Sequence, residues 1–228
     1  MLDAEAYLSS LISLLRRQYG PRLAYVGLQG SYLRGEATEQ SDLDVMVVVE
    51  DLGVADLDAY RDAIRSLGNF ERSCGFICGK EDLACWNPLE ICHLLHTTKD
   101  YYGSLSALVP AYTREDVRSF VKISVNNLYH ELCHRYVHAS PERNTAALPE
   151  TYKGVFFILQ NLHYLETGAF FPTKALLLPR LTGTDKAVLE TAIRLRDGGE
   201  YDFAACYGLL FSWCRETIRR LSELGAPL

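Results

Sequence analysis

Two aspartates placed two residues apart have the clearest chemical potential in this sequence. Asp42 and Asp44 stand at the start of an apolar run, residues 45–49. Because side chains alternate along a strand, both carboxylates are expected to project from one face. Carboxylate oxygens are the ligands that Mg²⁺ prefers, and Mg²⁺ usually keeps coordination positions for substrate phosphates. The spacing therefore predicts a carboxylate pair that holds metal.

A turn with phosphate-binding chemistry precedes this pair. Gly30 permits a tight turn, and Ser31 adds a hydroxyl and an amide where a helix is expected to begin. Phosphate recognition beside a metal site is what phosphoryl and nucleotidyl transfer require. Taken singly, a Gly-Ser turn or an Asp-x-Asp strand entrance is common. Their combination between two strands favours the catalytic interpretation.

The segments around this motif predict an α/β domain. Short apolar runs rich in β-branched residues indicate strands, and apolar residues at helical spacing indicate helices. The predicted strands are 23–28, 45–49, 75–78 and 89–95, and the predicted helices are 3–18 and 55–67.

After Gly103 the chain reads as helical, and a second domain is expected there. Thr113 is a good N-cap because acids follow it in the first turn. The polar, Pro-containing segment 139–149 is expected to be a loop. The predicted helices of this part are 113–136, 150–166, 185–196 and 203–223.

Charge, hydropathy and cysteine content limit which classes of function this chain can have. The net charge of −6 argues against a protein that grips nucleic acid and is compatible with a small or cationic substrate. No apolar run is long enough to span a bilayer, and residues 1–20 do not resemble a signal peptide, so a cytoplasmic location is expected. The seven cysteines are scattered and are expected to be reduced; Cys74 and Cys78 read as buried thiols.

The spelling G-S-Y-x-R-G-x-A-T-x-x-S-D-x-D over residues 30–44 resembles the signature of the nucleotidyltransferase superfamily related to DNA polymerase β. It is closest to the small bacterial branch with the aminoglycoside, lincosamide and minimal nucleotidyltransferases. The resemblance implies a small mixed-sheet domain of α+β or α/β type over residues 1–110 and a helical bundle over 111–228. It also implies transfer of a nucleoside monophosphate from a triphosphate, with ATP preferred, to a hydroxyl, with two Mg²⁺ held by Asp42 and Asp44.

A third carboxylate is expected from a neighbouring strand, as metal ligand or base. Glu90 is the prediction, because a charge in the apolar run 89–95 would be costly without a function. The Leu-Glu-Ile wording also resembles the base-bearing strand of aminoglycoside adenylyltransferases. Glu81 and Asp82 are alternatives that read more like a turn and helix start, and a Glu90 facing solvent is the non-functional alternative.

Three further residues are predicted to contact the nucleotide. Arg34 is expected to close over the triphosphate, with pairing to Glu36 or Glu39 as the alternative. Ser41 lies next to the metal pair, and Lys99 is expected to reach a phosphate unless it is simply a surface lysine.

His130, His134 and His138 repeat at helical spacing with Cys133 nearby, which is compatible with a metal site. Helical spacing also produces such stripes by chance, and no carboxylate pair completes a known motif. The favoured interpretation is that these side chains pack along the helix without binding metal.

Three functions remain open from the sequence. The leading one is transfer of a nucleotide to a small hydroxylated acceptor, such as an antibiotic, without nucleic acid or membrane. The second keeps the chemistry and changes the acceptor to a protein hydroxyl. The third is a catalytically silent nucleotide-binding module, which retention of Gly30, Ser31, Asp42 and Asp44 disfavours. Whether a homodimer completes the site is also open.

Overall fold

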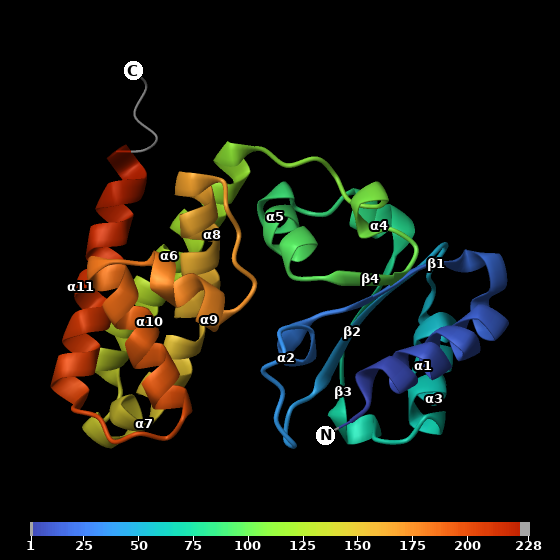
Figure 1. The fold of residues 1–228 in the computed structure, drawn as a ribbon, viewed down its shortest axis with the longest axis horizontal. Helices are drawn as coiled ribbons and strands as arrows, with labels where there is room; N and C mark the ends of the chain where they lie inside the picture. Colours follow the sequence, from blue (N-terminus) through green and yellow to red (C-terminus); the bar gives the residue numbers. More distant parts are fainter. Residues whose placement is uncertain (1, 224–228) are drawn as a thin grey trace. The chain divides into compact units, whose positions relative to one another are not determined.

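The protein is described by a computed structural model that covers residues 2–223. The chain forms two compact units, of which the first ends at Tyr112 and the second begins at Thr113 (Figure 1). A mixed sheet in the first unit, and helices without strands in the described residues 113–223 of the second, confirm the predicted fold class.

The N-terminal unit is built on a four-stranded sheet in the order β3-β2-β1-β4. The strand β1 pairs antiparallel with β2 and with β4, whereas β2 and β3 are parallel. The strands are β1 Leu23–Leu28, β2 Leu43–Val49, β3 Ser73–Gly79 and β4 Lys99–Tyr102. Both faces of β1 and β2 are buried, which explains why these strands read as continuous apolar runs.

Helices cover this sheet on two sides. Leu8, Leu11 and Leu15 of α1 are fully buried in the cluster that contains alternate residues of β1 and β2. The opposite face packs against Leu83 and Leu105. The helices of this unit are α1 Ala4–Tyr19, α2 Gly30–Leu33, α3 Val54–Ser66, α4 Lys80–Ala84 and α5 Pro88–His96, with short 3₁₀ turns at Gly20–Arg22, Phe70–Arg72 and Leu105–Ala107.

The strand predicted at 89–95 is wrong, because this segment is helix α5. Asn87 accepts a hydrogen bond from the Leu89 amide at 3.1 Å, and Pro88 occupies the first turn, where its missing N–H is harmless. Ile91 and Cys92 are buried, whereas Glu90 is exposed. The sheet edge is instead formed by β4.

The C-terminal unit is a helical bundle. Its helices are α6 Arg114–His138, α7 Pro141–Lys153, α8 Val155–Thr167, α9 Lys174–Leu177, α10 Gly183–Arg196 and α11 Phe203–Glu223, with a 3₁₀ turn at Leu178–Arg180. Leu159 of α8 and Trp213 of α11 are completely buried in the core of this unit. Among the described residues, every helix is too short or too polar to meet the requirements of a membrane span.

The loop predicted at 139–149 is also wrong, because α7 begins at Pro141. Ser140 caps this helix by accepting from the Arg143 amide at 3.4 Å. Pro149 lies inside the helix, and the helix predicted at 150–166 is divided at Gly154 between α7 and α8.

Candidate active site

The turn between β1 and β2 brings Gly30 against Asp44. Gly30 has a φ of +68°, and a Cβ atom added there would lie 1.8 Å from Oδ2 of Asp44. The Gln29 amide donates to the Asp44 carbonyl oxygen at 2.9 Å, which fixes the two strand ends. Glycine is therefore required both for the backbone conformation and for the space that the carboxylate occupies.

Asp42 and Asp44 lie at the start of β2, Asp42 exposed and Asp44 half-buried. Burial raises the pKa of the Asp44 carboxyl, and the negative charge of Asp42 raises it further. A hydrogen bond from the Cys74 thiol and the charge of Arg34 act in the opposite direction. The two carboxylates are thus close enough to repel each other, which a bound cation would relieve.

The sequence does not place Cys74 beside Asp44, but the structure does. It faces Asp44 across the β2–β3 register, and it is exposed, so the predicted buried thiol is wrong at this position. The residue as a whole is exposed, but partial burial of its sulfur, together with the negative charge of Asp44, raises the pKa of the Cys74 thiol, so it stays a protonated donor toward Asp44. The neighbouring strand therefore presents a thiol where a third carboxylate was expected.

The donor set fits Mg²⁺ bound together with a substrate. Within residues 2–223, no group of three or more His, Cys, Asp or Glu side chains is arranged to hold a metal ion. Proteins usually bind Mg²⁺ through one or two carboxylates, and substrate phosphates and water complete its coordination. A site with two carboxylates and no further protein ligand fits this pattern. Asp42 and Asp44 offer this set.

The one-turn helix α2 carries the predicted phosphate-binding residues. With four residues, it is too short for a substantial macrodipole. The amides of its first turn have no partner within the helix, and these amides and the Ser31 hydroxyl are the groups that could receive phosphate oxygens.

Arg34 and His93 lie together beside this turn. Nε of Arg34 is 3.2 Å from Oε2 of Glu36, so the predicted alternative of a local ion pair is present. Burial and the positive charge of Arg34 lower the pKa of His93 to about 4. His93 of α5 is therefore neutral at physiological pH. The sequence does not single it out, because the apolar run 89–95 predicts a strand there rather than a helix that faces the motif.

Ser41 and Arg72 hold the loop that leads to Asp42. The Ser41 hydroxyl accepts from the Thr38 amide at 2.8 Å, so it organises the loop. Nη2 of Arg72 donates to the Ser41 carbonyl oxygen at 2.9 Å and to the Tyr32 hydroxyl at 3.0 Å. The sequence does not indicate this role for Arg72, because the residue lies outside the motif.

The roles predicted for Glu90 as base and for Lys99 as a phosphate contact stay predictions. Glu90 is exposed on α5 and accepts from Nε1 of Trp86 at 2.8 Å, so the argument from an apolar strand is wrong. Lys99 pairs with Leu28 at the end of β1, close in sequence to Gly30. Its Nζ lies 3.2 Å from the Tyr101 hydroxyl and 3.8 Å from Oε1 of Glu5.

The histidine stripe lies on the exposed surface of α6. The ring centroids of His130 and His134 are 6.0 Å apart, and those of His134 and His138 are 4.7 Å apart. These are ring contacts along one helix, and Asp42 and Asp44 belong to the other unit.

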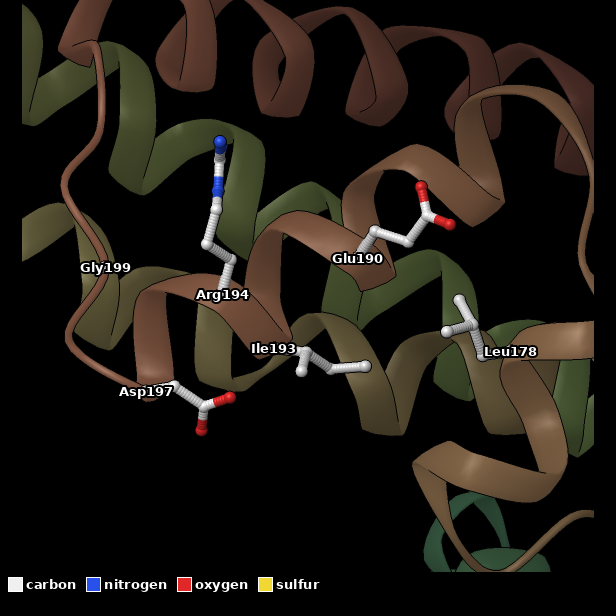
Figure 2. Close-up of a pocket in the computed structure, with 6 residues that line it drawn as sticks. All are labelled: Leu178, Glu190, Ile193, Arg194, Asp197 and Gly199. Atoms are coloured by element: carbon white, nitrogen blue, oxygen red, sulfur yellow. The ribbon is translucent and has the colours of Figure 1, made fainter.

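Two hollows among the described residues of the helical unit are lined by residues other than the predicted site residues. One, of about 410 Å³, is lined by Leu178, Glu190, Ile193, Arg194, Asp197 and Gly199. Figure 2 shows that most of these residues come from α10 and its end, and that their side chains do not converge on one point. A second, of about 530 Å³, lies among α6, α7 and α8 and is lined by Leu128, Arg135, Thr151 and Phe157 among others.

Comparisons with known proteins found a matching family model and similar solved structures. Residues 8–72 match the family model described as nucleotidyltransferase domain. The fold is similar to that of spectinomycin adenyltransferase AAD(9) from Enterococcus faecialis, solved with ATP and spectinomycin, with 15% identity, a TM-score of 0.60, and coverage of 94% of this chain and 99% of that chain. A toxin-antitoxin structure with AMP-PNP shares 20% identity over 59% of this chain and 94% of that chain, with a TM-score of 0.33. No curated protein sequence matches.

Proposed function

Because residues 8–72 carry a nucleotidyltransferase domain, we propose that the chain transfers AMP from ATP to a hydroxyl of a small molecule. The observation that carries this proposal is the packing of the Asp44 carboxylate against Gly30, beside the exposed Asp42. It supports a metal-holding pair next to a phosphate-binding turn, which is the arrangement that nucleotidyl transfer requires.

The proposed acceptor is a hydroxylated molecule that carries an amine, of the kind found among aminocyclitol and aminoglycoside antibiotics. Two observations support it. The fold is shared with an enzyme crystallised with spectinomycin, and the net charge of −6 favours a cationic partner.

In the proposed reaction, the acceptor oxygen bonds to the α-phosphorus of ATP while the bond to the bridging oxygen breaks and pyrophosphate leaves. Asp42 and Asp44 would hold two Mg²⁺, which supply charge neutralisation and alignment of the reacting oxygens. The amides of α2 and Ser31 would receive phosphate oxygens, and Arg34 and Lys99 would face the triphosphate. The acceptor proton passes to a base, for which Glu90 is the predicted residue.

The test is incubation of the purified chain with Mg²⁺ and labelled ATP, CTP, GTP or UTP against a panel of aminocyclitol, aminoglycoside and lincosamide antibiotics. Label transfer and pyrophosphate release are both measured. With ATP and an accepted antibiotic, Asp42→Asn and Asp44→Asn are each expected to lower the rate by roughly 100-fold or more, because several kcal/mol of charge stabilisation is lost. Chelation of Mg²⁺ should abolish transfer.

Asp58→Asn is the matched control, since Asp58 lies on α3 in an exposed ion pair with Arg61. Full activity in both motif variants would show that the metal assignment is wrong. Nucleotide binding without transfer to any acceptor would favour a silent module, and transfer to protein alone would favour a protein hydroxyl. The variant Glu90→Gln decides the role of Glu90 in the same assay.

A further inference from the structure

We propose that Arg72 is a positioning residue that fixes Asp42 by clamping the end of the motif loop to α2. This inference rests on the proposed function for its catalytic consequence. Its structural part stands on hydrogen bonds that join three segments, namely α2, the loop after it and the 3₁₀ turn Phe70–Arg72.

The sheet register places Arg72 beside Asp42. The strands β2 and β3 are parallel, and their pairing begins with Leu43 opposite Ser73. Asp42 and Arg72 each immediately precede these first paired residues. The arginine therefore lies in the turn immediately before the neighbouring strand β3, at the level of the metal-holding pair.

A single nitrogen of Arg72 joins the two ends of the motif. Its Nη2 donates to the Ser41 carbonyl oxygen at 2.9 Å and to the Tyr32 hydroxyl at 3.0 Å. The Tyr32 hydroxyl also accepts from the Leu2 amide at 3.1 Å, which ties this contact to the start of the chain. The residue immediately before Asp42 is thereby held against the phosphate-binding turn.

Asp42 depends on this clamp more than Asp44 does. Asp44 is half-buried and packs against Gly30, whereas Asp42 is exposed, so the direction of its carboxylate follows the backbone at Ser41. Nε of Arg72 is buried and has no hydrogen-bond acceptor among the described residues. Such an unsatisfied donor is costly, and its retention is consistent with a guanidinium placed for the sake of its Nη2 contacts.

The inference is tested with Arg72→Leu, which removes the donors, and Arg72→Lys, which keeps a donor. For transfer from ATP, Arg72→Leu is expected to lower kcat roughly 10- to 100-fold, the usual effect of losing a group that orients a metal ligand. The KM for ATP should change little, and the Mg²⁺ concentration for half-maximal rate should rise. Arg72→Lys should recover part of the loss.

A readout independent of activity is amide hydrogen exchange in the loop. The Thr38 and Ser41 amides, which bond to Ser41 Oγ and to the Thr38 carbonyl, should exchange at least roughly tenfold faster in Arg72→Leu, while β1 and β2 keep their protection. The control is Arg65→Leu, since Arg65 is exposed on α3 and stacks 4.8 Å from the Phe70 ring centroid without touching the motif.

Tyr32→Phe removes one of the two acceptors. Combined with Arg72→Leu, it should reduce kcat no further than Arg72→Leu alone, because both belong to one network. Unchanged loop exchange and unchanged kcat in Arg72→Leu would overturn the inference, as would an equal loss of protection in β1 and β2. If the unmodified chain transfers nothing, the proposed function fails, and the exchange experiment still decides whether Arg72 holds the loop.

Discussion

Single residues of this site constrain one another through contact. The Asp44 carboxylate occupies the space that any side chain at position 30 would need, and Gly30 also has a positive φ. His93 approaches the same turn from α5 and is kept neutral by burial and by Arg34. A residue far from the motif in sequence therefore lies beside it, and its pKa is lowered there.

His93 makes the stability of the N-terminal unit depend on pH. Its pKa falls from 6.5 to about 4 on folding, so between these values the unfolded chain binds the extra proton and stability declines as the pH is lowered. Between pH 7 and pH 5 this loss should be about 1–2 kcal/mol. In His93→Gln, the loss of unfolding free energy between pH 7 and pH 5 should be smaller by that amount. The measurement is urea unfolding, monitored by hydrogen exchange of the amides of β1 and β2. Equal declines in both proteins would contradict the shifted pKa.

Among the helices, α7 shows how a local rule can be overridden by a distant contact. Pro149 has no amide to donate to the Thr145 carbonyl oxygen one turn earlier, as a continuous helix requires. The Tyr201 hydroxyl donates to this oxygen instead, at 2.7 Å. A segment rich in turn-forming residues thus remains helical because a residue from the α10–α11 connection replaces the missing donor.

The Tyr201 contact should matter only while Pro149 is present. Tyr201→Phe is expected to lower the stability of the helical unit by about 1 kcal/mol, the net value of one hydrogen bond. In a Pro149→Ala background the helix supplies its own donor, so the same change should cost close to nothing. Chemical denaturation of the four proteins gives the coupling energy. A coupling energy of zero would mean that Tyr201 does not replace the missing helix donor.

At the scale of the whole molecule, the chain forms two compact units. The motif and its supporting residues belong to the first unit. The second is held by a network in which Asp185 accepts from Nε1 of Trp213 at 2.7 Å and from Nη1 of Arg220 at 2.9 Å. Arg220 also pairs with Glu166. This network connects α8, α10 and α11, none of which carries a motif residue.

Asp185→Ala should therefore destabilise one unit selectively. Removal of the carboxylate leaves a buried indole N–H and a partly buried guanidinium without this partner, and about 2 kcal/mol should be lost. Hydrogen exchange should accelerate in α10 and α11 but not in β1 and β2. Glu190→Ala on the same helix is the control, since Glu190 is exposed and 3.9 Å from Nζ of Lys186, and it should have little effect. Equal acceleration in the sheet would show that the two units unfold together.

Local sequence determined the parts of this protein that depend on neighbouring residues. The strands on either side of the motif, the Gly30 turn, and the carboxylates of Asp42 and Asp44 at one strand entrance follow from spacing and turn chemistry over about fifteen residues. The resemblance to nucleotidyltransferases rests on the same stretch, and residues 8–72 match the family model described as nucleotidyltransferase domain.

Tertiary structure decided what depends on distant contacts. The apolar run 89–95 alone did not distinguish a strand from α5. The Asn87 cap followed by Pro88 is a local helix signal, but which strand completes the sheet is decided by pairing between distant segments. Arg72 meets its partners 40 and 31 residues away in the chain, and Tyr201 meets Thr145 56 residues away. Such pairings are set by the register of strands and the packing of helices, which no short window of sequence contains.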